Sequence, residues 1–348
     1  MNIGLGLFDP NDRNLILAAK TIARGGLVVI PTETVYGIAC NMQNKKAVER
    51  LYAIKSRPKD KPFTIHIDRK DRVEEFVPQI PVSAYKLMSK FWPGPLTIIF
   101  NGRQGTVGIR MPDDEVAASI IARVVRPVVC PSANISGKPA PVTFADALRD
   151  LDGLVDLAVD AGPARLGVES TIVDVTHETP HVVRTGAIPV EGINQALAKK
   201  TVLFICTGNS CRSVMAEALL KKIMQEKGRT DVEVISAGIM MLLGIGATSA
   251  TKEVLSTEGI DVSKHLSRKV TTDMVRRSDL ILVMEKLHEE KVLQLVPDAK
   301  NRVFLLKEFA KIDGTTLGID DPIGKSLEFY QKTMQVIKEA VTRVSEVI

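Results

Sequence analysis

Residues 202–220 have the sequence VLFICTGNSCRSVMAEALL, and this stretch decides the fold of the second half of the chain. It starts as an apolar strand of the kind that is buried on both faces of a parallel sheet. A small-residue turn, CTGNSCRS at 206–213, follows, and a helix then continues to Gly228. Because further strand candidates alternate with helices, the pattern predicts a doubly wound parallel sheet. These candidates lie at 232–238, 279–284 and 302–308.

The turn has a cysteine and an arginine separated by five residues, Cys206 and Arg212. A strand–loop–helix turn presents backbone N–H groups and the positive end of a helix dipole to a phosphoryl group. A thiol at the start of such a loop is held as a thiolate. Arg212 adds a planar fork for two phosphate oxygens, and Ser213 can stabilise the thiolate as a leaving group. Gly208 permits an unusual backbone angle, and Asn209 is suited to pinning the loop.

The spacing alone is short and favours a buried cysteine at a strand end beside a surface arginine. Here, however, a buried strand precedes Cys206 and a helix follows Arg212. Phosphoryl transfer also needs an acid that protonates the leaving group, and Asp320-Asp321-Pro322 supplies one. The combination favours Cys206 as a nucleophile.

Three segments together resemble the low-molecular-weight protein phosphatase family: 202–220, SAG at 236–238 and DDPIG at 320–324. The resemblance covers residues 201–348. It implies Cys206 as nucleophile, Arg212 as phosphate clamp and Asp321 as general acid, with a phosphocysteine intermediate and no metal. It also implies that Cys211 can form a protective disulfide with Cys206. The remaining residues of the implied phosphate loop are Thr207, Gly208, Asn209, Ser210, Cys211 and Ser213.

Substrates differ among the members of this family, which includes tyrosine phosphatases, arginine phosphatases and arsenate reductases. The reductases need further cysteines downstream, and this chain has none after Cys211. The stretches 240–247 (MMLLGIGA) and 321–324 (DPIG) lack an aromatic residue that could stack on a phenol. Ser210 stands where arginine-directed members have Thr and tyrosine-directed members have an aliphatic residue. We therefore expect phosphoarginine as the substrate, with phosphotyrosine as the alternative.

The first half of the chain alternates helix and strand patterns and predicts a mixed α/β domain with a twisted sheet. A length of 348 residues suggests two domains, which we expect at 1–199 and 200–348. The expected helices lie at 14–24 and 47–57, and the expected strands lie at 26–31, 62–67, 95–100, 107–111 and 126–134.

Polar residues of the first half gather in loops at strand ends, where α/β sheets bind ligands. Lys55, Arg57, Lys59 and Lys61 against Asp60 give a local charge of +3, which suits a triphosphate. Taken alone, this cluster favours a solvated loop after a helix. The basic cluster is interpreted differently when it is considered together with three further segments: PTETVYG at 31–37, PSANISG at 131–137 and ESTIVD at 169–174.

These segments resemble the YrdC-like threonylcarbamoyl-AMP synthase family over about residues 8–195. The resemblance implies that L-threonine, bicarbonate and ATP condense to threonylcarbamoyl-adenylate with release of pyrophosphate, and that the product feeds modification of a tRNA adenosine. Mg²⁺ on the triphosphate follows from the chemistry. The residues implied for threonine are Thr34, His66, Arg110, Ser132 and Ser170. Those implied for ATP are Lys55, Arg57, Lys61, Asn134 and Arg184.

Composition excludes several classes of protein. Four cysteines in 348 residues do not make a disulfide framework, and neither a C-x-x-C pair nor a His cluster suggests a metal site. Without a signal peptide or a membrane-spanning run, we expect a cytoplasmic protein. Residues 1–199 contain 24 Lys and Arg against 21 Asp and Glu, and residues 200–348 contain 22 against 20.

One alternative for the first half is an RNA-binding module without synthase activity, which would use the basic cluster to bind tRNA phosphates. The near-neutral charge and the few aromatic residues count against it. The expected partners are therefore threonine, bicarbonate, ATP and a phosphorylated protein, with tRNA or tRNA-modification proteins as further candidates.

Overall fold

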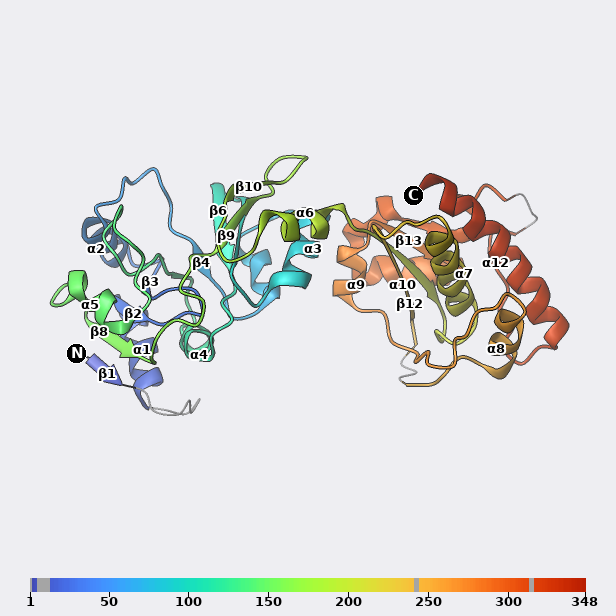
Figure 1. Cartoon of the computed structure of the whole chain (residues 1–348), viewed down its shortest axis with the longest axis horizontal. Helices are drawn as coiled ribbons and strands as arrows, with labels where there is room; N and C mark the ends of the chain where they lie inside the picture. Colours follow the sequence, from blue (N-terminus) through green and yellow to red (C-terminus); the bar gives the residue numbers. More distant parts are fainter. Residues whose placement is uncertain (1, 5–12, 241–243, 313–315) are drawn as a thin grey trace. The chain divides into compact units, whose positions relative to one another are not determined.

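The computed structural model describes residues 2–4, 13–240, 244–312 and 316–348. The chain divides into two compact units, Met1–Ala196 and Leu197–Ile348 (Figure 1). This division falls just before the boundary expected between 199 and 200, inside helix α6 (Val190–Ala198). Both units are α/β, as the sequence predicts.

In the described part of the first unit, ten strands form one sheet in the order β1-β8-β2-β3-β7-β4-β6-β5-β9-β10. The sheet is mixed: β4 and β6 are parallel, whereas β5 and β6 are antiparallel. The strands are β1 (Asn2–Gly4), β2 (Val28–Ile30), β3 (Gly37–Asn41), β4 (Ile65–His66), β5 (Leu96–Gly102), β6 (Gly105–Arg110), β7 (Val128–Val129), β8 (Leu157–Asp160), β9 (Thr171–Asp174) and β10 (His181–Arg184).

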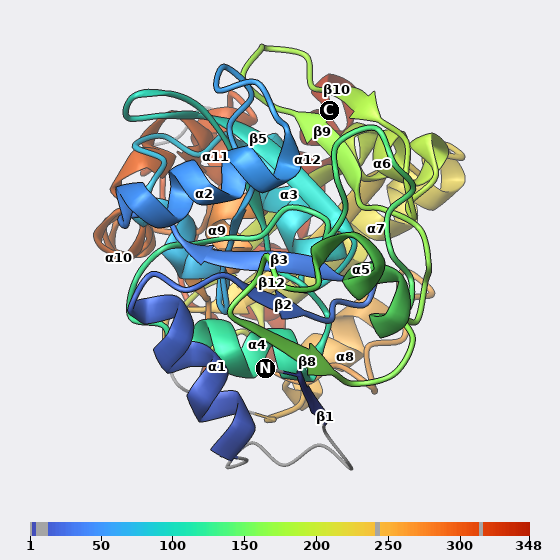
Figure 2. The ribbon, with the colours of Figure 1, turned by 90° about the vertical axis from the view of Figure 1, so that its left-hand side faces the viewer.

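Helices α1 (Arg13–Ala23) and α4 (Glu115–Arg123) pack together against β2, β3, β7 and β8 through one apolar cluster (Figure 2). Leu15 and Ile120 are completely buried in it, because both helices place apolar residues at helical spacing on one face. The other helical segments are α2 (Lys45–Lys55), η1 (Lys70–Glu75), α3 (Val82–Phe91) and α5 (Phe144–Leu151).

The second unit contains a four-stranded parallel sheet in the order β12-β11-β13-β14. Strand β11 lies between β12 and β13, so the chain leaves it at the point where the strand order reverses, and a crevice forms at such a switch point. The strands are β11 (Lys200–Cys206), β12 (Val232–Gly238), β13 (Leu280–Val283) and β14 (Val303–Leu305). The last of these is shorter than expected, because the chain continues as helix α11 (Leu306–Phe309).

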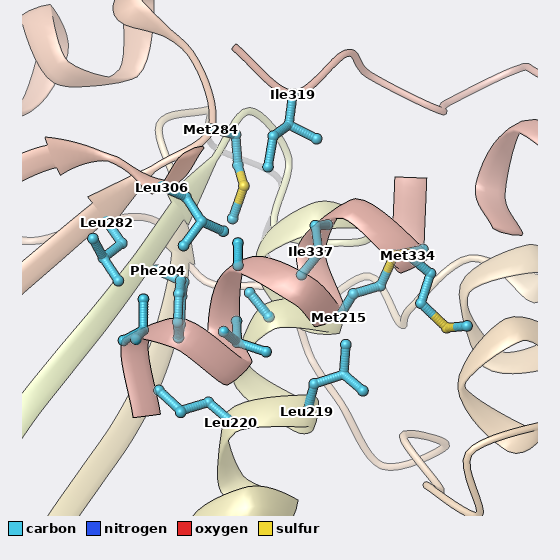
Figure 3. Packing of buried hydrophobic residues seen from close by; sticks show 14 of the residues in the cluster. Phe204, Met215, Leu219, Leu220, Leu282, Met284, Leu306, Ile319, Met334 and Ile337 are labelled. Carbon is cyan, nitrogen blue, oxygen red and sulfur yellow. The ribbon is translucent and has the colours of Figure 1, made fainter. Parts of the chain in front are cut away.

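Helices cover both faces of this sheet, which confirms the doubly wound prediction. Phe204 and Leu282 pack on one face against Met215 of α7 and Ile337 of α12 (Figure 3). Ile205 and its neighbours pack on the other face with residues of α9 and α10, since successive side chains of a strand point to opposite faces. The helical segments are α7 (Arg212–Glu226), α8 (Ser249–Ser256), α9 (Thr272–Arg277), α10 (Lys286–Leu295), η2 (Pro297–Arg302) and α12 (Leu327–Val347).

Candidate active sites

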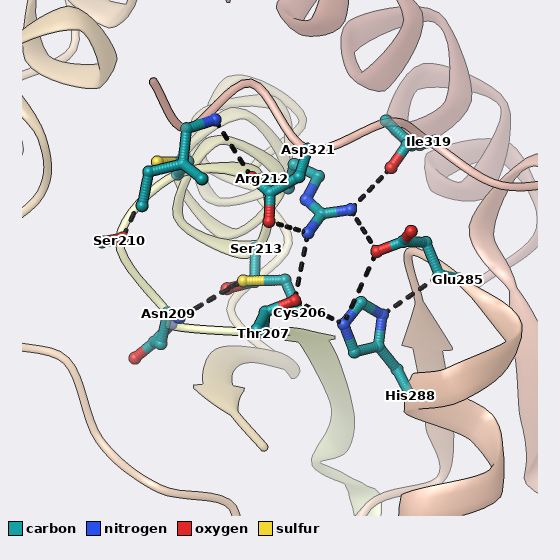
Figure 4. Close-up of polar contacts among 12 residues, drawn as sticks. Cys206, Thr207, Asn209, Ser210, Arg212, Ser213, Glu285, His288, Ile319 and Asp321 are labelled. Carbon is teal, nitrogen blue, oxygen red and sulfur yellow. Dashed lines mark hydrogen bonds and ion pairs between the residues drawn. The ribbon is translucent and has the colours of Figure 1, made fainter. Parts of the chain in front are cut away.

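The first candidate site lies at the carboxyl end of β11, where Cys206 is the last strand residue and Arg212 begins α7. The buried Cys206 Sγ lies 3.0 Å from Ser213 Oγ, and it accepts the backbone N–H of Asn209 at 3.3 Å (Figure 4). Two donors thus converge on the sulfur, and donors of this kind stabilise a thiolate. The sequence predicts both the residues and their proximity.

Asn209 holds the loop in a left-handed backbone conformation, with φ of 54°. Its side-chain Nδ2 donates to Ser213 Oγ at 3.0 Å and to Ser236 Oγ at 2.7 Å. Ser236 in turn donates to the carboxylate of Glu217. Asn209 Oδ1 accepts the backbone N–H of Arg268 at 3.0 Å, which fixes the orientation of the amide, and the amide nitrogen can only donate. Ser213 Oγ therefore accepts from Asn209 and is left to donate to Cys206, while Glu217 accepts from Ser236.

The SAG segment at the end of β12 explains how the loop packs so closely. A Cβ atom at Gly238 would lie 2.7 Å from the Thr207 carbonyl oxygen and 2.9 Å from the Asn209 nitrogen. Only glycine therefore fits where β12 passes beneath the loop.

Arg212 is almost completely buried and is surrounded by acceptors. One guanidinium nitrogen donates to Glu285 Oε2 at 2.6 Å and to the Ile319 carbonyl at 2.7 Å. The other donates to Thr207 Oγ1 at 3.2 Å and to the Asp321 carboxylate. The two carboxylates offset the desolvation of the buried cation. They also fix the fork beside the nucleophile.

Asp321 is one-third exposed, and its Oδ1 accepts the backbone N–H of Ile323 at 3.2 Å. Its other oxygen contacts Arg212, so the carboxyl group lies at the opening of the phosphate loop. The neighbouring Asp320 is exposed to solvent. Of the two adjacent acids, Asp321 is therefore the one that the described structure brings to the loop.

Glu285 and His288 also belong to this site, although the sequence alone does not predict either. His288 is fully buried; its Nδ1 accepts the Glu285 backbone N–H at 3.0 Å, and its Nε2 lies 3.0 Å from Thr207 Oγ1. Burial, together with the charge of Arg212, lowers the pKa of His288 to about 4, although Glu285 and Asp321 oppose this shift. The ring is therefore neutral at pH 7. A signal was available, because both residues follow β13 at the same sheet edge as Cys206.

The side chain of Cys211 contacts different residues from those that the side chain of Cys206 contacts. Its Sγ lies 3.6 Å from Thr248 Oγ1, 3.5 Å from the Tyr330 hydroxyl and 3.7 Å from the buried Ser210 hydroxyl. Burial, and then the contact with Cys211, raises the pKa of Tyr330 to about 12. A disulfide between Cys206 and Cys211 remains a prediction.

Aliphatic side chains are exposed in two segments, one that follows β12 and one that follows Asp321. Met240 and Ile245 are each 51% exposed, and Ile323, two residues after Asp321, is 56% exposed. Residues 241–243 of the MMLLGIGA segment lie outside the described residues.

The second candidate site is a cavity of about 140 Å³ in the first unit. It brings together strand-end residues from β4, β6 and β10 with loop residues that precede β3 and β9. The predicted site residues that line it are Thr34, Arg57, His66, Arg110, Ser132, Ser170 and Arg184.

A buried charge of this cavity is Arg110, which lies 2.8 Å from the Glu33 carboxylate. Both side chains are buried, yet Nε and Nη2 of Arg110 and both Glu33 oxygens lack a hydrogen-bond partner among the described residues. The ion pair is close but poorly aligned for hydrogen bonding. Buried donors of this kind are normally satisfied, so Arg110 is suited to an anionic ligand in the cavity. Burial and the charge of Arg110 lower the pKa of the adjacent His66 to about 3.

Lys55 and Asn134 lie beside the cavity rather than in its lining. Lys55 Nζ donates to the Ser132 carbonyl at 2.7 Å and to Asn134 Oδ1 at 2.9 Å. Burial, together with the nearby Arg57, lowers the pKa of Lys55 to about 8. Lys61 is exposed, and its carbonyl accepts Arg57 Nε at 2.9 Å.

Three polar residues around the second candidate site are not predicted from the sequence: Glu33, Thr97 and Glu169. Thr97 Oγ1 lies 2.8 Å from Ser170 Oγ, and Glu169 pairs with Arg184 at 2.8 Å. Glu33 and Glu169 stand inside the quoted PTETVYG and ESTIVD segments. Thr97 lies on β5, which is parallel to β9, and only the sheet pairing reveals it.

Comparison with known proteins places each unit in a family. The Sua5/YciO/YrdC family model, described as telomere recombination, matches residues 20–186. The model of low molecular weight phosphotyrosine protein phosphatases matches residues 201–348. A Mycobacterium tuberculosis protein, provisionally named a threonylcarbamoyl-AMP synthase, is 37% identical over 54% of this chain and 92% of its own length. A Ralstonia nicotianae protein named a probable low molecular weight protein-tyrosine-phosphatase is 37% identical over 41% of this chain and 91% of its own length.

The chain belongs to both families. Its first unit belongs to the Sua5/YciO/YrdC family and its second to the low-molecular-weight phosphatase family. The first unit is 39% identical to the threonylcarbamoyl-AMP synthase of Pyrococcus abyssi over 53% of this chain, but the match spans only 57% of that relative's length. A solved structure of Pyrococcus abyssi Sua5 complexed with L-threonine shares the fold at 23% identity, with a TM-score of 0.55 over 99% of this chain and 98% of that one.

Within the described part of the chain, no helix is long and apolar enough to cross a membrane.

Proposed function

We propose that the chain is a bifunctional enzyme, with a threonylcarbamoyl-AMP synthase in residues 1–199 and a cysteine-dependent protein phosphatase in residues 200–348. Membership in two enzyme families supports the two activities. Each domain has its own apolar core and its own candidate site.

The synthase would condense L-threonine, bicarbonate and ATP to threonylcarbamoyl-adenylate and pyrophosphate. The buried Arg110, with unsatisfied donors in the cavity, carries this assignment, because it offers a charged fork to a carboxylate such as that of threonine. Thr34, His66, Ser132 and Ser170 would complete the threonine site. Arg57, Lys61, Asn134 and Arg184 would hold ATP, with Lys55 at the phosphates or bicarbonate.

Magnesium fits this scheme only as an ion bound to ATP. No group of three metal-ligating side chains lies together among the described residues, so oxygens of the triphosphate would hold the ion. The product would serve tRNA modification, with tRNA or tRNA-modification proteins as partners.

Pyrophosphate release from ATP, threonine and bicarbonate, without any RNA present, tests the synthase. Dependence on all three substrates is the expected result. RNA binding without pyrophosphate release would favour the alternative, an RNA-binding module.

The phosphatase would use Cys206 as nucleophile, and the two donors on its sulfur carry this assignment. The thiolate attacks phosphorus, and the bond to the leaving nitrogen or oxygen breaks while Asp321 donates its proton to that atom. Water then attacks the phosphocysteine, Asp321 accepts a proton, and the S–P bond breaks to release phosphate. Because a bound phosphoryl group would compete with Asp321 for Arg212, binding would free the acid for this role.

Phosphoarginine is the proposed substrate of the phosphatase, as part of a phosphorylated protein. Ser210 is small and polar, and Met240, Ile245 and Ile323 expose aliphatic side chains rather than aromatic rings. Such side chains suit the methylene stem of arginine better than a phenol ring, which would favour stacking.

Phosphoarginine and phosphotyrosine peptides of matched sequence, offered side by side, test this choice. A higher kcat/KM for phosphoarginine is expected, whereas a preference for phosphotyrosine would favour the alternative. In either case the Cys206→Ser variant should be inactive.

A further inference from the structure

The side chain of Thr207, the residue directly after the nucleophile, lies between Arg212 and the buried His288 (Figure 4). Its Oγ1 is 3.0 Å from His288 Nε2 and 3.2 Å from the Arg212 nitrogen that also contacts Asp321. The hydroxyl therefore lies beside the phosphate clamp and the acid.

The direction of the contact with His288 follows from the other side of the ring. His288 Nδ1 lies 3.0 Å from the backbone nitrogen of Glu285, whose hydrogen can only be donated. Nδ1 is therefore an acceptor without a proton, and the hydrogen of the neutral ring is on Nε2. It follows that His288 donates to Thr207 Oγ1.

Arg212 has no acceptor atom, so it also donates to Thr207 Oγ1. With both lone pairs of the oxygen engaged, the hydroxyl hydrogen of Thr207 has to be donated. No acceptor for it lies among the residues that the structure describes. We propose that Thr207 donates this hydrogen bond to a phosphoryl oxygen of the substrate, as a ligand additional to the loop N–H groups and Arg212.

This inference rests on the proposed phosphatase function and assigns His288 a positioning role. When a phosphoryl group takes the donors of Arg212, His288 still holds one lone pair of Thr207, so the hydroxyl remains a donor toward the loop. The neutral ring supplies this orientation without adding charge. Glu285 contributes through both its backbone N–H and its ion pair with Arg212.

Two substitutions in the full chain separate the hydroxyl from the shape of the side chain. Thr207→Val keeps the shape and removes the donor, whereas Thr207→Ser keeps the donor. We expect Thr207→Val to lower kcat/KM for p-nitrophenyl phosphate by about 10- to 100-fold, as for a lost hydrogen bond to a charged group. The competitive inhibition constant of inorganic phosphate should rise by a similar factor. Thr207→Ser should stay close to wild type.

Thr201→Val is a matched control, because it makes the same change near the opposite end of β11, where the hydroxyl contacts Glu233. It should leave kcat/KM and phosphate inhibition unchanged. If thermal unfolding shows that Thr207→Val folds poorly, Thr207→Ala replaces it. Unchanged phosphate inhibition in the Val or Ala variant, or an equal loss in Thr207→Ser, would overturn the proposal.

A second readout keeps this inference separate from the phosphatase assignment. Inorganic phosphate should protect Cys206 from alkylation by iodoacetate, and this protection needs no turnover. If the wild-type chain lacks phosphatase activity, the proposed function fails. Weaker protection in Thr207→Val than in Thr207→Ser would still support the Thr207 ligand, and equal protection would refute it.

Discussion

At the scale of single residues, Glu217 supports the hydrogen bonds that end on the nucleophile, although no hydrogen bond joins it to Cys206. Replacing it with Met removes the acceptor for Ser236, so Ser236 no longer holds Asn209 in place, and the hydrogen bond from Ser213 to Cys206 weakens. The midpoint pH for alkylation of Cys206 by iodoacetate should rise by about 0.5 to 1 unit, the size of one net hydrogen bond.

The sign of this shift is decisive. If Glu217 acted only through its negative charge, its removal would favour the thiolate and the midpoint would fall. Lys221→Met removes the surface partner of Glu217 without touching Ser236, and should leave the midpoint nearly unchanged.

A second residue-scale prediction concerns the buried pair of Arg110 and Glu33. Arg110→Met leaves the Glu33 carboxylate buried and unpaired, which should destabilise the synthase domain by about 3 to 5 kcal/mol. Adding Glu33→Gln removes that charge and should recover much of the stability, measured by denaturant unfolding. Calorimetric titration should show that neither variant binds threonine; normal threonine binding by the double variant would contradict the assigned role of Arg110.

At the scale of elements, the end of β12 packs closely against the loop after β11. Gly238→Ala would force the added Cβ against backbone atoms of the loop, which cannot move aside as a side chain would. We expect a loss of about 1 to 3 kcal/mol in unfolding free energy and a large fall in kcat/KM. Gly246→Ala is the control, because its nearest new contact would be an ordinary 3.7 Å. Similar losses in both variants would argue against the close approach as the cause.

The start of α10 carries a pH-dependent contribution to stability through His288. The pKa of this residue is about 4 in the fold against an ordinary 6.5, so the unfolded chain binds more protons between these values. His288 therefore makes the fold less stable as pH falls from about 6.5 toward 4. In His288→Gln the amide can replace both ring contacts without titrating, so unfolding free energy should depend less on pH in this range. An unchanged slope would mean that folding does not lower the pKa of His288.

Strand pairing also explains which residues of the phosphatase site the sequence alone could predict. Cys206, Asn209, Arg212 and Ser213 are contiguous in one loop, so spacing alone brought them together. Glu285 and His288 reach the same place because Ile205 of β11 pairs with Val283 of β13, and this register cannot be read from a motif. Glu33 was not predicted for a different reason. A buried acid inside the PTETVYG segment becomes informative only once its partner Arg110 is known.

At the scale of the whole molecule, the two domains contain separate cores and separate sets of site residues. Each predicted reaction uses groups from one domain only, so damage to one site should leave the other reaction intact. Cys206→Ser should abolish phosphatase activity while pyrophosphate release keeps its wild-type kcat and KM for threonine. Ser170→Ala should give the reverse pattern. Because both substitutions are small, thermal unfolding should change little, and a fall in both activities from either one would mean that the two domains are functionally coupled.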